Sequence, residues 1–244
     1  GRRVSIDKRV ATLADAVLGI EDGSTVAVSG FGEAGIPTEL IHALVDQGAK
    51  DLTLVNNNAG TGHLGVSALL KAERVKKVIC SFPRSAKSVV FQELYKQGKI
   101  ELEVVPQGTL AERIRAGGAG IGGFYTPTAT GTPLAEGKEA RAIDGRDYVL
   151  EFPIRADVAL IKADKADPWG NLTYRKAARN FAPAMCMAAE LTIVQAREIV
   201  GLGDIDPEHV VTPSIFVDRV VEVAAPVSEA DALRRPGNVS RDKP

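Results

Sequence analysis

Short, apolar, β-branched runs alternate along this chain with amphipathic stretches that close on glycine. The runs occupy residues 25–28, 52–55, 75–80 and 102–105, so successive runs start roughly 25 residues apart. An interval of this length leaves room for a crossover helix, which parallel pairing of consecutive strands requires. The pattern therefore predicts a repeated strand–helix unit and an open, mostly parallel α/β sheet flanked by helices.

The helical pattern is clearest after the first run. Pro37 suits the first turn of a helix, and Gly48 is well placed to end one. The apolar positions between them share one helical face: Leu40, Ile41, Leu44 and Val45. Similar patterns predict helices over residues 87–97 and 109–116.

The pattern changes at the glycine-rich stretch 117–123, which predicts a loop or a close approach of two backbones. Asp144-Gly145, between apolar residues on both sides, is typical of a two-residue type I′ turn and predicts a late antiparallel hairpin. Further strands are expected at 158–161 and 192–194. The sheet is therefore predicted to be mixed.

Composition sets the limits on size and class. With 244 residues, 45% of them hydrophobic, the chain is long enough for one core, and we expect one domain over residues 1–226 and a disordered tail over 227–244. Cys80 and Cys186 lie far apart without metal-ligand spacing, which argues against a disulfide framework or a metal site.

The charge balance argues against two classes of partner. Lysine and arginine total 30 against 31 acidic residues, so no overall field favours nucleic acid or a membrane surface. No apolar run reaches the roughly 18 residues of a membrane span, and no signal-type segment follows the start. We therefore expect a cytoplasmic protein that binds any anionic ligand at a local site.

Residues 22–37 run from a strand through several glycines into a helix. Backbone amides in such a turn can point towards a ligand at the helix N-terminus, although a tight turn without a ligand gives the same pattern. Gly30, Gly32 and Gly35 fit G-x-G-x-x-G, but no acidic residue ends the second strand as a dinucleotide site requires.

Two further polar motifs follow strands. Residues 56–58 are all asparagine, and they form either an uncharged ligand-binding edge or a solvated turn. Gln107, after the fourth strand, can donate a hydrogen bond to a developing oxyanion. The same segment can begin a helix with a capping box made by Thr109 and Glu112, and the two interpretations are compatible.

These motifs occur in an order that is typical of one family. Segments 22–37, 57–60, 106–118, 125–128 and 170–181 together resemble the A half of family I CoA-transferases, and the likeness covers residues 10 to about 223. Ser29 departs from the pattern, since the family usually has glycine there. The resemblance implies that a CoA thioester is a substrate, with no tightly bound cofactor and no metal.

In that family a glutamate of the B half becomes a glutamyl-CoA intermediate. Its signature is absent from this chain, and Glu33 is interpreted as a solvated carboxylate near a helix N-terminus. The resemblance implies a heterodimer or heterotetramer with a separate B chain that carries the catalytic glutamate. It assigns oxyanion donation to Gln107 and substrate binding to residues of two loops: Asn57, Asn58, Gly30, Phe31, Gly32 and Gly35.

Segments 80–84, 93–95 and 134–139 resemble the members that move CoA from succinyl-CoA to 3-oxoadipate. Arg84 is then a candidate for binding the distant carboxylate, although such an arginine can equally be a surface or interface charge. Two alternatives stay open. One is transfer to acetoacetate or another 3-oxo acid, and the other is a stand-alone regulatory domain that binds CoA esters.

Overall fold

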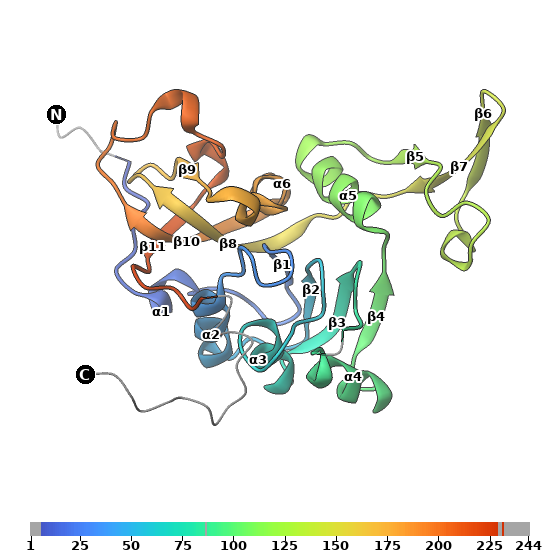
Figure 1. The fold of residues 1–244 in the computed structure, drawn as a ribbon, viewed down its shortest axis with the longest axis horizontal. Helices are drawn as coiled ribbons and strands as arrows, with labels where there is room; N and C mark the ends of the chain where they lie inside the picture. The colour runs from blue at the N-terminus through green and yellow to red at the C-terminus, as the bar shows by residue number, and fades with distance from the viewer. Residues whose placement is uncertain (1–5, 86, 229–230, 232–244) are drawn as a thin grey trace.

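The computed structural model describes residues 6–85, 87–228 and 231. Its central sheet carries helices on both faces, and a small second sheet projects from one end (Figure 1). The main strands lie in the order β11-β10-β8-β1-β2-β3-β4, and all neighbours in this order are parallel. These strands are β1 Thr25–Val28, β2 Leu52–Val55, β3 Val75–Cys80, β4 Glu101–Val104, β8 Ala156–Ala166, β10 Ala189–Ile199 and β11 Arg219–Glu222.

The first three predicted strands are confirmed residue for residue, and the fourth begins one residue earlier than predicted. The strands predicted at 158–161 and 192–194 extend to eleven residues each in β8 and β10. The main sheet is mixed only through β9 (Leu172–Thr173), which pairs antiparallel with β8. The predicted hairpin instead belongs to the separate sheet.

Helices cover the two faces of the main sheet unequally. The helices are α1 Leu13–Ala16, α2 Thr38–Gln47, α3 Val66–Lys71, α4 Val89–Lys96, α5 Gln107–Ala119 and α6 Ala182–Ala188. The first four pack on one face, and α5 and α6 pack on the other, so the sheet separates two hydrophobic clusters. Burial of each large aliphatic side chain in these clusters contributes about 1.5 to 3 kcal/mol.

Helix α2 forms as predicted. Leu40, Ile41 and Leu44 are completely buried against the sheet. Gly48 follows the helix with a φ of 99°, the left-handed conformation that glycine adopts without a steric cost. The helical face and the glycine stop therefore both follow from local sequence.

The loop predicted at 117–123 is partly wrong, because α5 continues to Ala119. A Cβ atom added to Gly117 would lie 2.0 Å from the Ile154 carbonyl oxygen, and one added to Gly118 would lie 2.6 Å from Met187 Cβ. The glycines thus allow a close approach of two backbones, which was the alternative prediction for this stretch. Helix propensity is overridden here by packing of α5 on its neighbours.

The small sheet has the order β5-β7-β6, with β5 at Phe124–Thr126, β6 at Ala140–Ile143 and β7 at Arg146–Glu151. Asp144 and Gly145 connect β6 to β7 with φ values of 49° and 76°, as the predicted type I′ turn requires. Four short 3₁₀ helices complete the elements: η1 Pro133–Ala135, η2 Lys176–Arg179, η3 Pro207–His209 and η4 Ser214–Phe216.

The predicted tail over 227–244 lies outside the described residues, apart from 227, 228 and 231. Within the part of the chain that the structure describes, each helix is too short or too polar to cross a membrane.

Candidate active site

Three neighbouring strands, β2, β3 and β4, end at the same edge of the sheet, and the residues after them surround an open pocket of about 510 Å³. It is lined by Phe31, Gly32, Asn57, Asn58, Thr61, Ser81, Phe82, Ser85 and Gln107. Five of these nine were predicted from sequence to bind substrate or stabilise an oxyanion. None of the described lining residues is a carboxylate.

Gln107 enters this pocket from the first turn of α5, directly after Pro106 at the N-cap. Its Nε2 atom donates to Asn57 Oδ1 at 2.8 Å. A side-chain amide nitrogen carries two hydrogens, so one N–H of Gln107 is left for a ligand. The predicted capping box is wrong, because the helix begins at Gln107 and Glu112 instead pairs with Arg115 at 3.0 Å.

Asn57 is 4% exposed and is held by bonds from two strand ends. Besides Gln107, the hydroxyl of Ser81 donates to its Oδ1 at 2.7 Å. Its backbone carbonyl accepts from the amides of Ser81 and Phe82 at 3.1 and 3.0 Å. Since Oδ1 accepts twice, the Nδ2 group is oriented as a second amide donor beside Gln107.

The flanking asparagines connect β2 to the glycine turn. Asn56 Nδ2 donates to the Val28 carbonyl at 2.8 Å, and Asn58 Nδ2 donates to the Gly32 carbonyl at 3.3 Å. The three asparagines are at most 7% exposed, so the interpretation as a solvated turn is wrong. The run is a buried, hydrogen-bonded edge.

The glycine segment forms a tight turn rather than passing straight into the helix. Phe31 and Ala34 exchange backbone hydrogen bonds of 3.0 and 3.1 Å. Gly32 has a φ of 59° and open space where a Cβ atom would stand, and it faces the pocket. It is therefore the glycine of this turn that leaves room for a ligand.

Gly30 and Gly35 serve internal packing and do not line this pocket. A Cβ atom at Gly30 would lie 2.1 Å from Ile36 Cδ1, and one at Gly35 would lie 2.5 Å from the Ala178 carbonyl oxygen. The expected anion site at the helix start is also partly filled from within, because the Leu40 amide donates to Gln195 Oε1 at 3.1 Å. These features favour a structural role at this end of α2.

Ser29, where the family usually has glycine, is completely buried. Its hydroxyl donates to the Gly35 carbonyl at 2.7 Å and accepts from the Lys162 amide at 3.1 Å. The departure from the family pattern therefore joins the glycine turn to β8.

Residues 10–223 match the family model described as coenzyme A transferase. The chain belongs to this family. It is 61% identical over 227 residues to the A chain of 3-oxoadipate CoA-transferase from Pseudomonas putida, and the match covers 93% of this chain and 98% of that protein. It is also 61% identical over 226 residues to the protein of the same name from Acinetobacter baylyi, covering 92% and 99% of the two chains.

The fold is also that of this family. The crystal structure of an acyl-CoA transferase from Escherichia coli O157:H7 superposes with a TM-score of 0.79 at 25% identity. The match covers 95% of this chain and 52% of the E. coli chain. This CoA-transferase chain thus spans about half the length of that protein.

Arg84 of the CoA-transferase chain is exposed and does not line the pocket, although Phe82 and Ser85 beside it do. It forms no ion pair or hydrogen bond with any residue that the structure describes. Glu33 lies at the tip of the glycine turn, outside the pocket that contains Gln107.

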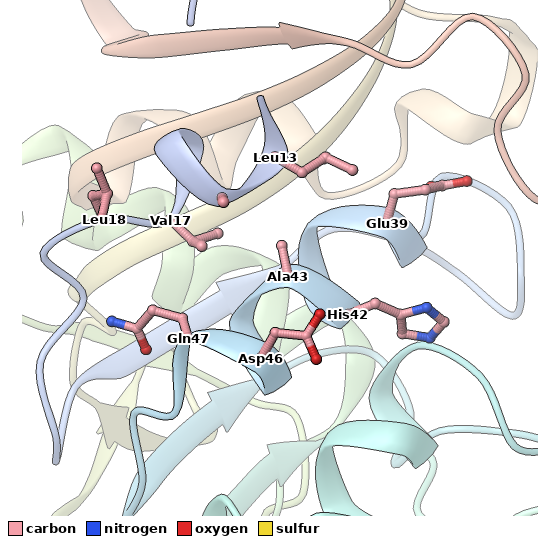
Figure 2. Close-up of a pocket in the computed structure, with 9 residues that line it drawn as sticks. Leu13, Val17, Leu18, Glu39, His42, Ala43, Asp46 and Gln47 are labelled. Carbon is pink, nitrogen blue, oxygen red and sulfur yellow. The ribbon is translucent and has the colours of Figure 1, made fainter. Parts of the chain in front are cut away.

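His42 lines a cavity outside the candidate active site and has a structural hydrogen bond. A groove of about 600 Å³ lies between α1 and α2, with Leu13 and Val17 on one side and Ala43, His42 and Asp46 of α2 on the other (Figure 2). His42 Nε2 accepts a hydrogen bond from the Gly65 amide at 3.0 Å. This groove contains none of the predicted site residues.

Sequence reasoning missed four lining residues as site residues: Thr61, Ser81, Phe82 and Ser85. Ser81, Phe82 and Ser85 could have been recognised from their place after the third strand, because ligands bind at this edge in such sheets. Burial raises the pKa of the neighbouring Cys80 thiol to about 12. That thiol is protonated at neutral pH, and the polar side chains that line the pocket are amides and hydroxyls.

Proposed function

We propose that this chain is the A half of a two-chain transferase that moves CoA from succinyl-CoA to 3-oxoadipate. The observation that carries the proposal is the 2.8 Å hydrogen bond from Gln107 Nε2 to Asn57 Oδ1, which fixes two side-chain amides side by side in an open pocket. The names of the relatives at 61% identity support 3-oxoadipate as the acceptor.

The reaction needs a donor group at the carbonyl under attack. A glutamate carboxylate of the B chain attacks the thioester carbonyl of succinyl-CoA and expels the CoA thiolate, which leaves a mixed anhydride. The thiolate then attacks the glutamyl carbonyl, which releases succinate and forms the glutamyl-CoA thioester. The carboxylate of 3-oxoadipate attacks the carbonyl of the glutamyl-CoA thioester and expels the CoA thiolate, which leaves a second anhydride. The thiolate then attacks the 3-oxoadipyl carbonyl of this anhydride, which yields 3-oxoadipyl-CoA and the free glutamate.

Each attack places negative charge on a carbonyl oxygen. The free N–H of Gln107 and the Nδ2 group of Asn57 supply donors for that charge, and both are oriented before substrate arrives. Donors that need no reorganisation stabilise a transition state more than a ground state. Phe31 and Phe82, which are 51% and 59% exposed, provide apolar surface at the same pocket.

Coexpression with a B chain that carries the glutamate tests the proposal. We expect the purified complex to transfer CoA from succinyl-CoA to 3-oxoadipate, and each chain alone to be inactive. Preference for acetoacetate across a panel of 3-oxo acids would assign a different acceptor. Activity of this chain alone would contradict the division of labour, and binding of CoA esters without turnover would favour a regulatory domain.

The role of Arg84 is a separate prediction. If its guanidinium binds the distant carboxylate of 3-oxoadipate, Arg84→Met should raise the KM for this acid by about tenfold or more, as loss of one charged hydrogen bond costs roughly 1.5 to 3 kcal/mol. The KM for a 3-oxo monocarboxylate should stay unchanged. Equal effects on the two acids would reduce Arg84 to a surface or interface charge.

A further inference from the structure

A second pocket, of about 620 Å³, lies on the other side of the glycine turn. Phe31 and Gly32 face the candidate active site, whereas Ala34 and Gly35 line this second pocket. Strand β1 lies between β8 and β2 in the sheet, so the turn after it separates the two pockets. Both are thus at the carboxyl edge of the sheet, where open α/β sheets bind ligands.

Part of the charge of this pocket arises from the alternation of side chains along two long strands. On β8, Val158 and Leu160 pack in the core below α2, and Lys162 continues the same face beyond the core. On β10, Ile193 is likewise buried, and Arg197 stands on its face four residues later. On this face of the sheet, both strands are therefore apolar in the core and cationic where they reach the pocket.

The lining contains four cations and one carboxylate, a net charge of +3: Lys162, Arg175, Lys176, Arg197 and Asp164. Arg197 pairs with Asp164 at 2.8 Å. Lys162, Arg175 and Lys176 form no ion pair with a described residue. Since the whole chain has a net charge of −1, this concentration of cations without an ion-pair partner among the described residues is local.

The segment that carries Arg175 and Lys176 is fixed to the glycine turn. Asn180 Oδ1 accepts from the Gly30 amide at 3.0 Å, and Asn180 Nδ2 donates to the Ala34 carbonyl at 2.9 Å. Gly35 lies so close to the Ala178 carbonyl that no larger residue fits. The two cations therefore hold a defined position relative to the turn and hence to the candidate active site.

We propose that this cationic pocket binds an organic phosphate of nucleotide size. Unpaired lysine and arginine groups around a cavity are the donors that phosphate oxygens require, and arginine can bind them in pairs. The source that best fits the adjacent active site is the phosphoadenosine end of the CoA thioester, and this part of the inference rests on the proposed function. A separate nucleotide is the other source of the same chemistry.

The test uses Lys162→Met and Arg175→Met, singly and combined, in the two-chain complex. Lys71→Met, at the exposed end of α3, is the matched control. Binding of adenosine 3′,5′-bisphosphate is measured by calorimetry, which does not depend on transferase activity. The KM and kcat are then measured for succinyl-CoA and for succinyl-pantetheine, which lacks the phosphates.

We expect the double variant to weaken bisphosphate binding and to raise the KM for succinyl-CoA, each by tenfold or more, with kcat and the KM for succinyl-pantetheine unchanged. Weakened bisphosphate binding with an unchanged KM for succinyl-CoA would support an organic-phosphate site and assign it to a separate nucleotide. Bisphosphate binding that is absent in the wild type, or equal in the double variant and Lys71→Met, would overturn the inference.

Discussion

Replacing Gln107 with alanine is expected to lower kcat of the assembled transferase by about a hundredfold or more, since removal of one oxyanion donor costs about 2.7 to 4 kcal/mol of transition-state stabilisation. The lost N–H acts on charge that develops during attack, so kcat and kcat/KM should fall together. Steady-state kinetics of the purified two-chain complex measure both constants.

The matched control is Gln97→Ala, at the exposed C-terminal end of α4. It removes the same side chain far from the pocket and should leave kcat unchanged. Size-exclusion chromatography of both variants should show an intact complex, because Gln107 is exposed and contributes little to packing. Wild-type turnover by Gln107→Ala would remove the assignment of this residue.

Replacing Gly117 with alanine is expected to destabilise the chain by about 3 kcal/mol, the upper range for overpacking of a core. The new Cβ atom would lie 2.0 Å from the Ile154 carbonyl oxygen. The helix cannot move away easily, because the Arg113 carbonyl accepts from the Ile154 amide at 2.8 Å and Arg113 Nε donates to the Phe152 carbonyl at 2.7 Å.

Gly108→Ala in the same helix provides the control, since open space surrounds the position of its Cβ atom. Alanine there should be neutral or stabilise by up to about 1 kcal/mol, as expected from helix propensity alone. Urea unfolding followed by circular dichroism compares the two variants. Equal midpoints would show that the contact of α5 with the 152–154 segment relaxes without cost.

Several parts of the site could be read from local sequence because they depend on local chemistry. β-Branched runs bounded by turn residues set the first three strands, and Asp144-Gly145 specified its own hairpin turn. Asn57 and Gln107 were each singled out by their place after a strand, and the carboxyl ends of parallel strands lie together. Both residues line one pocket at that edge.

Other parts could not be predicted, because they depend on contacts between distant segments. Gly117 reads as a helix breaker until Ile154 is placed against it. Gly35 reads as part of a ligand loop, yet its space is taken by the Ala178 carbonyl, 143 residues further along the chain by number. Arg84 was predicted to bind substrate only because of the segment in which it lies. The structure shows that its neighbours Phe82 and Ser85 line the pocket instead.

The sequence by itself determined the family and the strand–helix repeat, and it singled out Gln107 and Asn57 as candidate site residues, because motif order and side-chain alternation are properties of the chain. Only the tertiary structure decided which glycines have open space beside a pocket and which are packed against other atoms, since that depends on what lies opposite each Cα atom. It also placed Lys162 of β8 and Arg175 around the same cavity, and so created a cationic pocket that neither segment specifies alone.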